Sequence, residues 1–240
     1  MRLNNEKYVD KRVPFTNEQL PIIQEIDSFL EGEKFRETLE TVISNPGYET
    51  VARKLPLAMR IQDPDTIKEM LHTFFAQLKR GIQYVYERYG IVADHFDISG
   101  DTCIGKRGQF EGYTIRYVPE LDYITIDYES LAVVCTGIMN DLKGSIVPIE
   151  HCGNFYHVSI KDAIFLGGVE EAHHAYYMKS KKISSYKAPL TLEEYKSDPV
   201  ELAAGKVVRQ AIQEHGIQIY LFINGLHIPI PWNCPERDTP

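Results

Sequence analysis

The sequence predicts an α+β fold, in which a helical N-terminal part precedes a small mixed sheet packed with a pair of helices. Apolar residues recur with a period near 3.6 through most of the first 90 residues, which is the pattern of amphipathic helices. Beyond residue 90, short segments rich in β-branched and aromatic residues are separated by Gly, Pro and Asp, as strands and turns are. We therefore expect a mostly helical region at 1–90 and an α+β region at 91–240, which could also form one continuous domain.

Three helices are expected in the N-terminal part, behind an extended arm at residues 1–15. The first would start at Thr16 as N-cap, because apolar residues at helical spacing follow it. The longest helical pattern would start at Asp63 or Asp65 and end at Gly90. The expected helices lie at 16–32, at 33–47 with a turn at Asn45-Pro46-Gly47, and at 63–90.

Strands and two further helices are expected after residue 90. Residues 113–128 are expected to form a hairpin that turns at 119–122, whereas 128–142 fit either a helix or a strand. The last helix should have Ser197 or Asp198 as its N-cap and Gly216 just after its end. The remaining expected elements are a helix within 153–182, the last helix within 197–216, a strand at 217–224 and a Pro-rich tail at 225–240.

The composition indicates a globular protein and argues against some classes of function. Its 26 basic and 34 acidic side chains give a net charge of −8, so binding to nucleic acid or to a membrane is not expected. No apolar run reaches the roughly 18 residues of a membrane span, and the polar N-terminus has no signal-peptide core. We expect a cytoplasmic protein with reduced thiols, because the four cysteines form no CxxC pair; its oligomeric state is left open.

One stretch, GGVEEAHHAYYM at 167–178, places two glutamates and two histidines among apolar residues. On a helix, Glu170, His174 and Glu171 share an arc of about 100°, with His174 between the two glutamates. His173 lies about 60° to the other side of Glu170. A helix that is apolar around most of its circumference is buried, and buried charges need partners. A bound metal ion is one such partner, which makes this stretch and the next helix a candidate metal-site helix pair.

The five residues from Glu170 to His174 resemble the His-Glu-x-x-His helix of the zincin metallopeptidases, whose two ligands stand four residues apart, with a general base after the first. Glu170 stands at the first ligand position, Glu171 at the base position and His174 at the second ligand position. Glu201, in the segment SDPVELAAGKVV, resembles the acidic ligand that these enzymes carry on the following helix. The resemblance covers roughly residues 113–215.

This resemblance implies a metal-dependent hydrolase of peptide or amide bonds that acts on a peptide or protein substrate. Glu170, His174 and Glu201 would be metal ligands, and Glu171 would activate a metal-bound water for attack on a carbonyl. Zinc is the expected ion, with iron or manganese as alternatives, because a carboxylate in place of the first histidine suits harder metals. His173 would replace the missing histidine ligand, support a ligand through a hydrogen bond, or form a hydrogen bond elsewhere.

Three other interpretations stay open on the sequence alone. Glu and His at helical spacing also form solvated or salt-bridged faces. Glu-x-x-His pairs occur in di-iron bundles, although this chain has one such stretch and several expected strands. In the third interpretation, Glu170 in place of His abolishes tight zinc binding. The chain is then a non-catalytic interaction protein with a degenerate peptidase-like fold that works through its first 90 residues.

Overall fold

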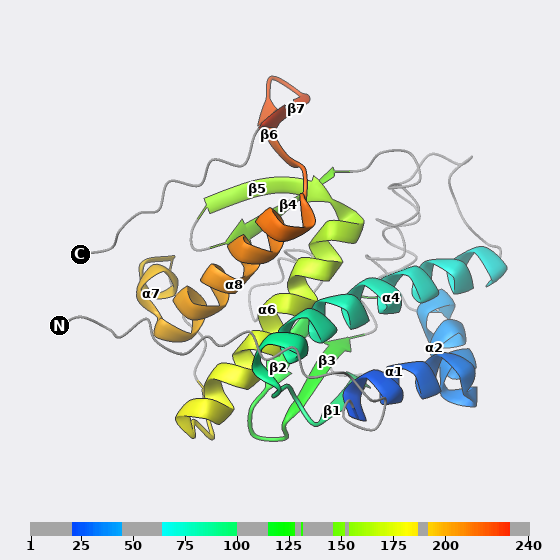
Figure 1. Ribbon diagram of the computed structural model, residues 1–240. Helices are drawn as coiled ribbons and strands as arrows, with labels where there is room; N and C mark the ends of the chain where they lie inside the picture. Colours follow the sequence, from blue (N-terminus) through cyan, green and yellow to red (C-terminus); the bar gives the residue numbers. More distant parts are fainter. Residues whose placement is uncertain are drawn as a thin grey trace.

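The computed structural model describes residues 21–44, 64–99, 115–127, 131, 146–151, 154–186 and 192–230 (Figure 1). Its helices are α1 (Pro21–Glu31), α2 (Glu33–Ser44), α4 (Pro64–Tyr89), α6 (Ile160–Lys181), α7 (Leu192–Ser197) and α8 (Pro199–His215). Its strands are β1 (His95–Ser99), β2 (Ile115–Val118), β3 (Tyr123–Asp127), β4 (Ile146–His151), β5 (Asn154–Ser159), β6 (Ile219–Ile223) and β7 (Leu226–Ile230).

The strands form two small sheets, and the predicted α+β class is confirmed. One sheet has the order β1-β3-β2, with β1 parallel and β2 antiparallel to β3, so it is mixed as predicted. The second sheet has the order β4-β5-β6-β7, and all its neighbouring strands are antiparallel. One hydrophobic cluster contains residues from both sides of the predicted boundary at residue 90, and that boundary stays a prediction.

Helix α6 lies at the centre of the packing and contacts α4, α8 and β2 (Figure 1). It meets α4 where glycines face each other, because a Cβ on Gly168 would lie 2.7 Å from Leu78 O and 3.3 Å from Gly81 Cα. Only glycine permits so close an approach of two helix backbones without displacement. The amphipathic pattern predicted for 63–90 supplies the other side of this contact, with Phe74, Leu78 and Ile82 of α4 fully buried.

The predicted helix ends agree with the structure in most places that it describes. Asp198 is the N-cap of α8, Gly216 is its left-handed C-cap, and Gly90 with φ +68° follows α4. Asp65 is not an N-cap, because α4 already begins at Pro64, where proline suits the first helical turn. The predictions for 1–15, Thr16, the turn at 45–47 and Asp63 lie outside the described residues, as does 128–142 apart from Leu131.

The two hairpins give one confirmed prediction and one correction. The hairpin predicted at 113–128 is present, because β2 pairs antiparallel with β3 across a turn at 119–122. The predicted Pro-rich tail is wrong for residues 226–230, which form β7. Asn224 and Gly225 both have positive φ, the conformation of a tight two-residue hairpin turn. Pro229 is tolerated in β7 because this is an edge strand, where a missing N–H breaks no ladder.

Candidate metal centre

Helix α6 carries the EEAHH stretch through the protein interior. Ser159 caps its N-terminus by accepting a hydrogen bond from Asp162 N, and Lys182 in the left-handed conformation ends it. Residues on all sides of α6 are buried, which is the arrangement that its apolar circumference predicted. His173 and His174 are 4% and 7% exposed. Two imidazoles are therefore held away from solvent, and their ring nitrogens depend on protein groups for partners.

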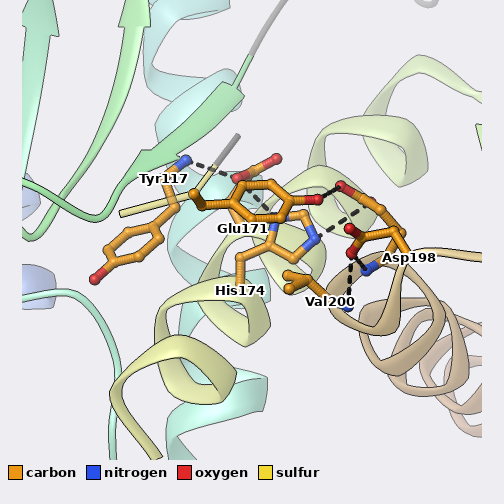
Figure 2. Close-up of polar contacts among 7 residues, drawn as sticks. Tyr117, Glu171, His174, Asp198 and Val200 are labelled. Carbon is orange, nitrogen blue, oxygen red and sulfur yellow. Dashed lines mark hydrogen bonds and ion pairs between the residues drawn. The ribbon is translucent and has the colours of Figure 1, made fainter. Parts of the chain in front are cut away.

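Helix α8 brings Glu201 to the same place. The Asp198 side chain accepts hydrogen bonds from Val200 N at 2.7 Å and from Glu201 N at 3.2 Å (Figure 2). These bonds fix the first turn of α8, because an N-cap satisfies backbone donors that have no partner within the helix. Glu201, in that first turn, is 7% exposed, so its carboxylate is held inside the protein next to α6.

Three of the four predicted metal ligands converge. Glu170, His174 and Glu201 each offer a ligand atom, and these atoms all lie within 4.8 Å of one another. Glu201 Oε2 lies 3.4 Å from His174 Nε2. Two ligands at about 2.0–2.1 Å from a tetrahedral ion are separated by about 3.4 Å, so this pair already has the spacing of a shared metal. A pair near the 4.8 Å limit would have to close by about 1.4 Å to reach this tetrahedral spacing, and by at least about 0.6 Å for both atoms to bind one ion.

His174 Nε2 is the atom that fits a metal best. It is fully buried, and it has no hydrogen-bond partner among the described residues. Its contact with Glu201 Oε2 at 3.4 Å is an ion pair whose geometry falls short of a hydrogen bond. A buried nitrogen without a hydrogen bond is costly, and coordination to a cation would satisfy it.

The other ring nitrogen of His174 is held by Glu171. Glu171 Oε2 lies 3.2 Å from His174 Nδ1 and also accepts a 2.6 Å hydrogen bond from Tyr117 N of β2 (Figure 2). A carboxylate on Nδ1 favours the tautomer or protonation state that has a hydrogen there and leaves Nε2 to face the site. Glu171 Oε2 thus lies on the Nδ1 side of His174, where it can orient the imidazole ring.

The two histidines are in opposite electrostatic environments. Burial by itself lowers the pKa of His174, but the Glu171 and Glu201 carboxylates outweigh it and hold that pKa well above its ordinary value. Burial, with His174 beside it, lowers the pKa of His173 to about 4. In the metal-free protein His174 is therefore a cation between two carboxylates at neutral pH, whereas His173 is neutral.

His173 lies outside the group of three convergent ligands. Its ring packs edge-on against Tyr89, with centroids 5.4 Å apart, and lies 5.5 Å from the ring of Tyr176. Its Nδ1 is buried and has no hydrogen-bond partner among the described residues. The roles predicted for His173 as a ligand and for Glu171 as a general base stay predictions.

Sequence reasoning missed Tyr186. Its hydroxyl donates a 3.1 Å hydrogen bond to Glu201 Oε1, on the opposite side of that carboxylate from His174. Burial raises the pKa of Tyr186, and the charges of Glu201 and Asp198 add to the effect, so the phenol stays protonated as a donor. It follows α6 in a polar, lysine-rich stretch, and no motif marks a single tyrosine there as part of a site.

None of the described helices combines the length and the apolar character needed to cross a membrane. Comparison with protein-family models, curated protein sequences and solved structures found no match to this chain. The functional assignment therefore rests on the geometry of Glu170, His174 and Glu201.

Proposed function

We propose that this protein binds a divalent metal ion at Glu170, His174 and Glu201 and hydrolyses peptide or amide bonds there. The convergence of three buried or half-buried ligand side chains from two helices carries the proposal. Three protein ligands are the usual set for a catalytic zinc, whereas structural zinc sites have four. Zinc is the first expectation, and the two carboxylates also suit iron or manganese.

The bound ion would supply an acidified water and polarise the scissile carbonyl. Hydrolysis adds the oxygen of water to the carbonyl carbon, breaks the C–N bond and delivers a proton to the leaving nitrogen. We assign that proton transfer to Glu171, which lies beside His174. The described contacts of Glu171, with Tyr117 N and His174 Nδ1, both involve Oε2. Oε1 would therefore be the oxygen that takes up the proton from water and passes it to the leaving nitrogen.

Metal content and hydrolysis test the proposal together. Protein purified without chelator or histidine tag should contain about one equivalent of zinc, iron or manganese by elemental mass spectrometry. Glu201→Ala and His174→Ala should lose this metal, because each removes one of three ligands. The wild type, loaded with each metal in turn, should cleave labelled casein or short peptide amides. A folded wild type that stays metal-free would refute the site.

Glu171→Gln separates the chemistry from metal binding. Gln keeps the size of the side chain and an oxygen for Tyr117 N, but it cannot take up a proton. At saturating metal we expect kcat to fall by about 10²–10⁴, the usual contribution of a general base. Glu193→Gln, an exposed carboxylate on α7, is the matched control and should leave kcat unchanged. Equal rates for Glu171→Gln and wild type would refute the assigned proton transfer.

A second candidate function, protein interaction, is favoured by the hairpin of β6 and β7. Five of the seven exposed large apolar residues in the described part of the chain lie on it: Leu221, Phe222, Ile223, Leu226 and Ile228. Residues 217–230 contain no Asp, Glu, Lys or Arg, so this surface does not repel its own copy. Self-association that Leu221→Ser abolishes, measured by sedimentation velocity, would support this function. A concentration-independent monomer would argue against it.

A further inference from the structure

We propose that Tyr186 is a positioning residue, which presents one oxygen of Glu201 to the metal and withholds the other. This inference rests on the proposed metal site, and it assigns a role to a residue outside the two helices that carry the ligands.

The two oxygens of Glu201 have different partners. Oε1 accepts the hydroxyl hydrogen of Tyr186 at 3.1 Å, whereas Oε2 lies 3.4 Å from His174 Nε2. A carboxylate can bind a metal through one oxygen or through both. With Oε1 engaged by a phenol, the favoured mode is a single bond through Oε2, which is the oxygen that already faces the histidine ligand.

The chain that leads to Tyr186 is held by the end of α6. Lys182 turns the chain at the end of α6 with φ +57°, and Ile183 N donates a 2.9 Å hydrogen bond to Met178 O. These are the contacts of a helix C-cap in which the last carbonyls are satisfied. Ile183 and Tyr186 then pack against the hydrophobic core. Tyr186 is therefore held by the end of α6 and by the core, and its hydroxyl reaches a carboxylate of α8.

This arrangement completes a set of supports on both sides of the ligand pair. Glu171 holds His174 from the Nδ1 side, and Tyr186 holds Glu201 from the Oε1 side. Each support contacts the atom that does not face the site, which is Nδ1 of His174 and Oε1 of Glu201, and leaves Nε2 and Oε2 facing each other. Groups that orient metal ligands in this way typically change metal affinity 10- to 100-fold when they are removed.

Tyr186→Phe tests the role, because it deletes the hydroxyl and keeps the ring that packs on the core. We expect the Kd for zinc, measured by competition with a chromophoric chelator, to rise about 10- to 100-fold. We also expect the visible spectrum of the Co²⁺-loaded variant to change, because Glu201 becomes free to bind through both oxygens and raise the coordination number. A residue with a merely structural role would not move that spectrum.

Tyr84→Phe is the matched control. Like Tyr186, Tyr84 packs with the hydrophobic core, and its hydroxyl donates to a carboxylate at the same 3.1 Å, but this carboxylate is Glu214, which is not among the convergent ligands. Its zinc Kd and Co²⁺ spectrum should equal those of the wild type. An unchanged Kd and spectrum in folded Tyr186→Phe, with metal bound by the wild type, would overturn the role of Tyr186 alone. Failure of the wild type to bind zinc or Co²⁺ would overturn the metal site and this role with it.

Discussion

Replacing Gly81 by alanine tests the close helix contact that positions α6. A Cβ on Gly81 would lie 2.8 Å from Val169 N, 2.9 Å from Gly168 C and closer still to Phe165 O. These are backbone atoms that cannot rotate away, so α4 and α6 would have to separate locally by roughly 0.5–1 Å in a close-packed interior. Overpacking costs up to about 3 kcal/mol, and alanine regains at most about 1 kcal/mol of helix stability. We expect Gly81→Ala to lower the free energy of unfolding by about 2 kcal/mol.

Gly167→Ala is the matched control for this prediction. It also replaces a glycine of α6, but on the side that faces β2, where its Cβ would meet only Ile115 Cδ1, at 3.0 Å. That atom is the end of a flexible side chain, so the cost of contact and the gain in helix propensity should nearly cancel, to within about 1 kcal/mol. Urea unfolding of the metal-free proteins, followed by circular dichroism, measures both changes. Equal stability of the two variants would refute the reasoning from the backbone contacts.

Three further predictions concern the ionisable groups of the site. His173 has a folded-state pKa of about 4 against an ordinary 6.5, so the unfolded chain takes up the proton first as the pH falls. The free energy of unfolding should therefore fall as the pH drops from 6.5 toward 4, and His173 accounts for up to about 3 kcal/mol of this loss. His173→Phe should flatten this part of the stability profile in urea titrations. Because the pKa of His174 is raised, metal binding near neutral pH should release about one proton, measurable by calorimetry in buffers of different ionisation enthalpy. Glu170→His should increase the preference for zinc over manganese in competition titrations, because imidazole nitrogen suits zinc better than a carboxylate does.

The fold class and most helix ends were predictable because they depend on local chemistry. Asp198 caps α8 through hydrogen bonds that reach only two and three residues along the chain. Gly216 closes the same helix in a left-handed conformation that glycine adopts at little cost. Strand β7 was missed because Pro229 argues against a central strand, and whether a strand lies at an edge depends on the whole sheet.

The ligand group was predictable for a similar reason. Glu170 and His174 are four residues apart on one helix, and Glu201 follows the capping signal of the next helix. The contacts that hold Glu171 and Tyr186 in place were less predictable, because they depend on how separate elements pack and not on spacing along one helix. Glu171 is 54 residues from the Tyr117 N–H that it accepts, and no sequence pattern records that contact. The same holds for Tyr186, whose position depends on how α6 ends.

The position of Glu171 depends on more than its own helix. Tyr117 is held at both ends, since its N–H binds Glu171 and its hydroxyl donates a 2.9 Å hydrogen bond to Asp122. Asp122 in turn forms an ion pair with Lys179 of α6 at 2.6 Å. Strand β2 is thus connected to α6 at two places. One is the hydrogen bond to Glu171, about one helical turn before His174, and the other is the link through Asp122 to Lys179, near the end of the helix. Because the strand is anchored at two points, Glu171 Oε2 is held 3.2 Å from His174 Nδ1, and Nε2 is left facing Glu201. The mixed sheet therefore acts as the scaffold of the site, although it contributes no ligand to the convergent group.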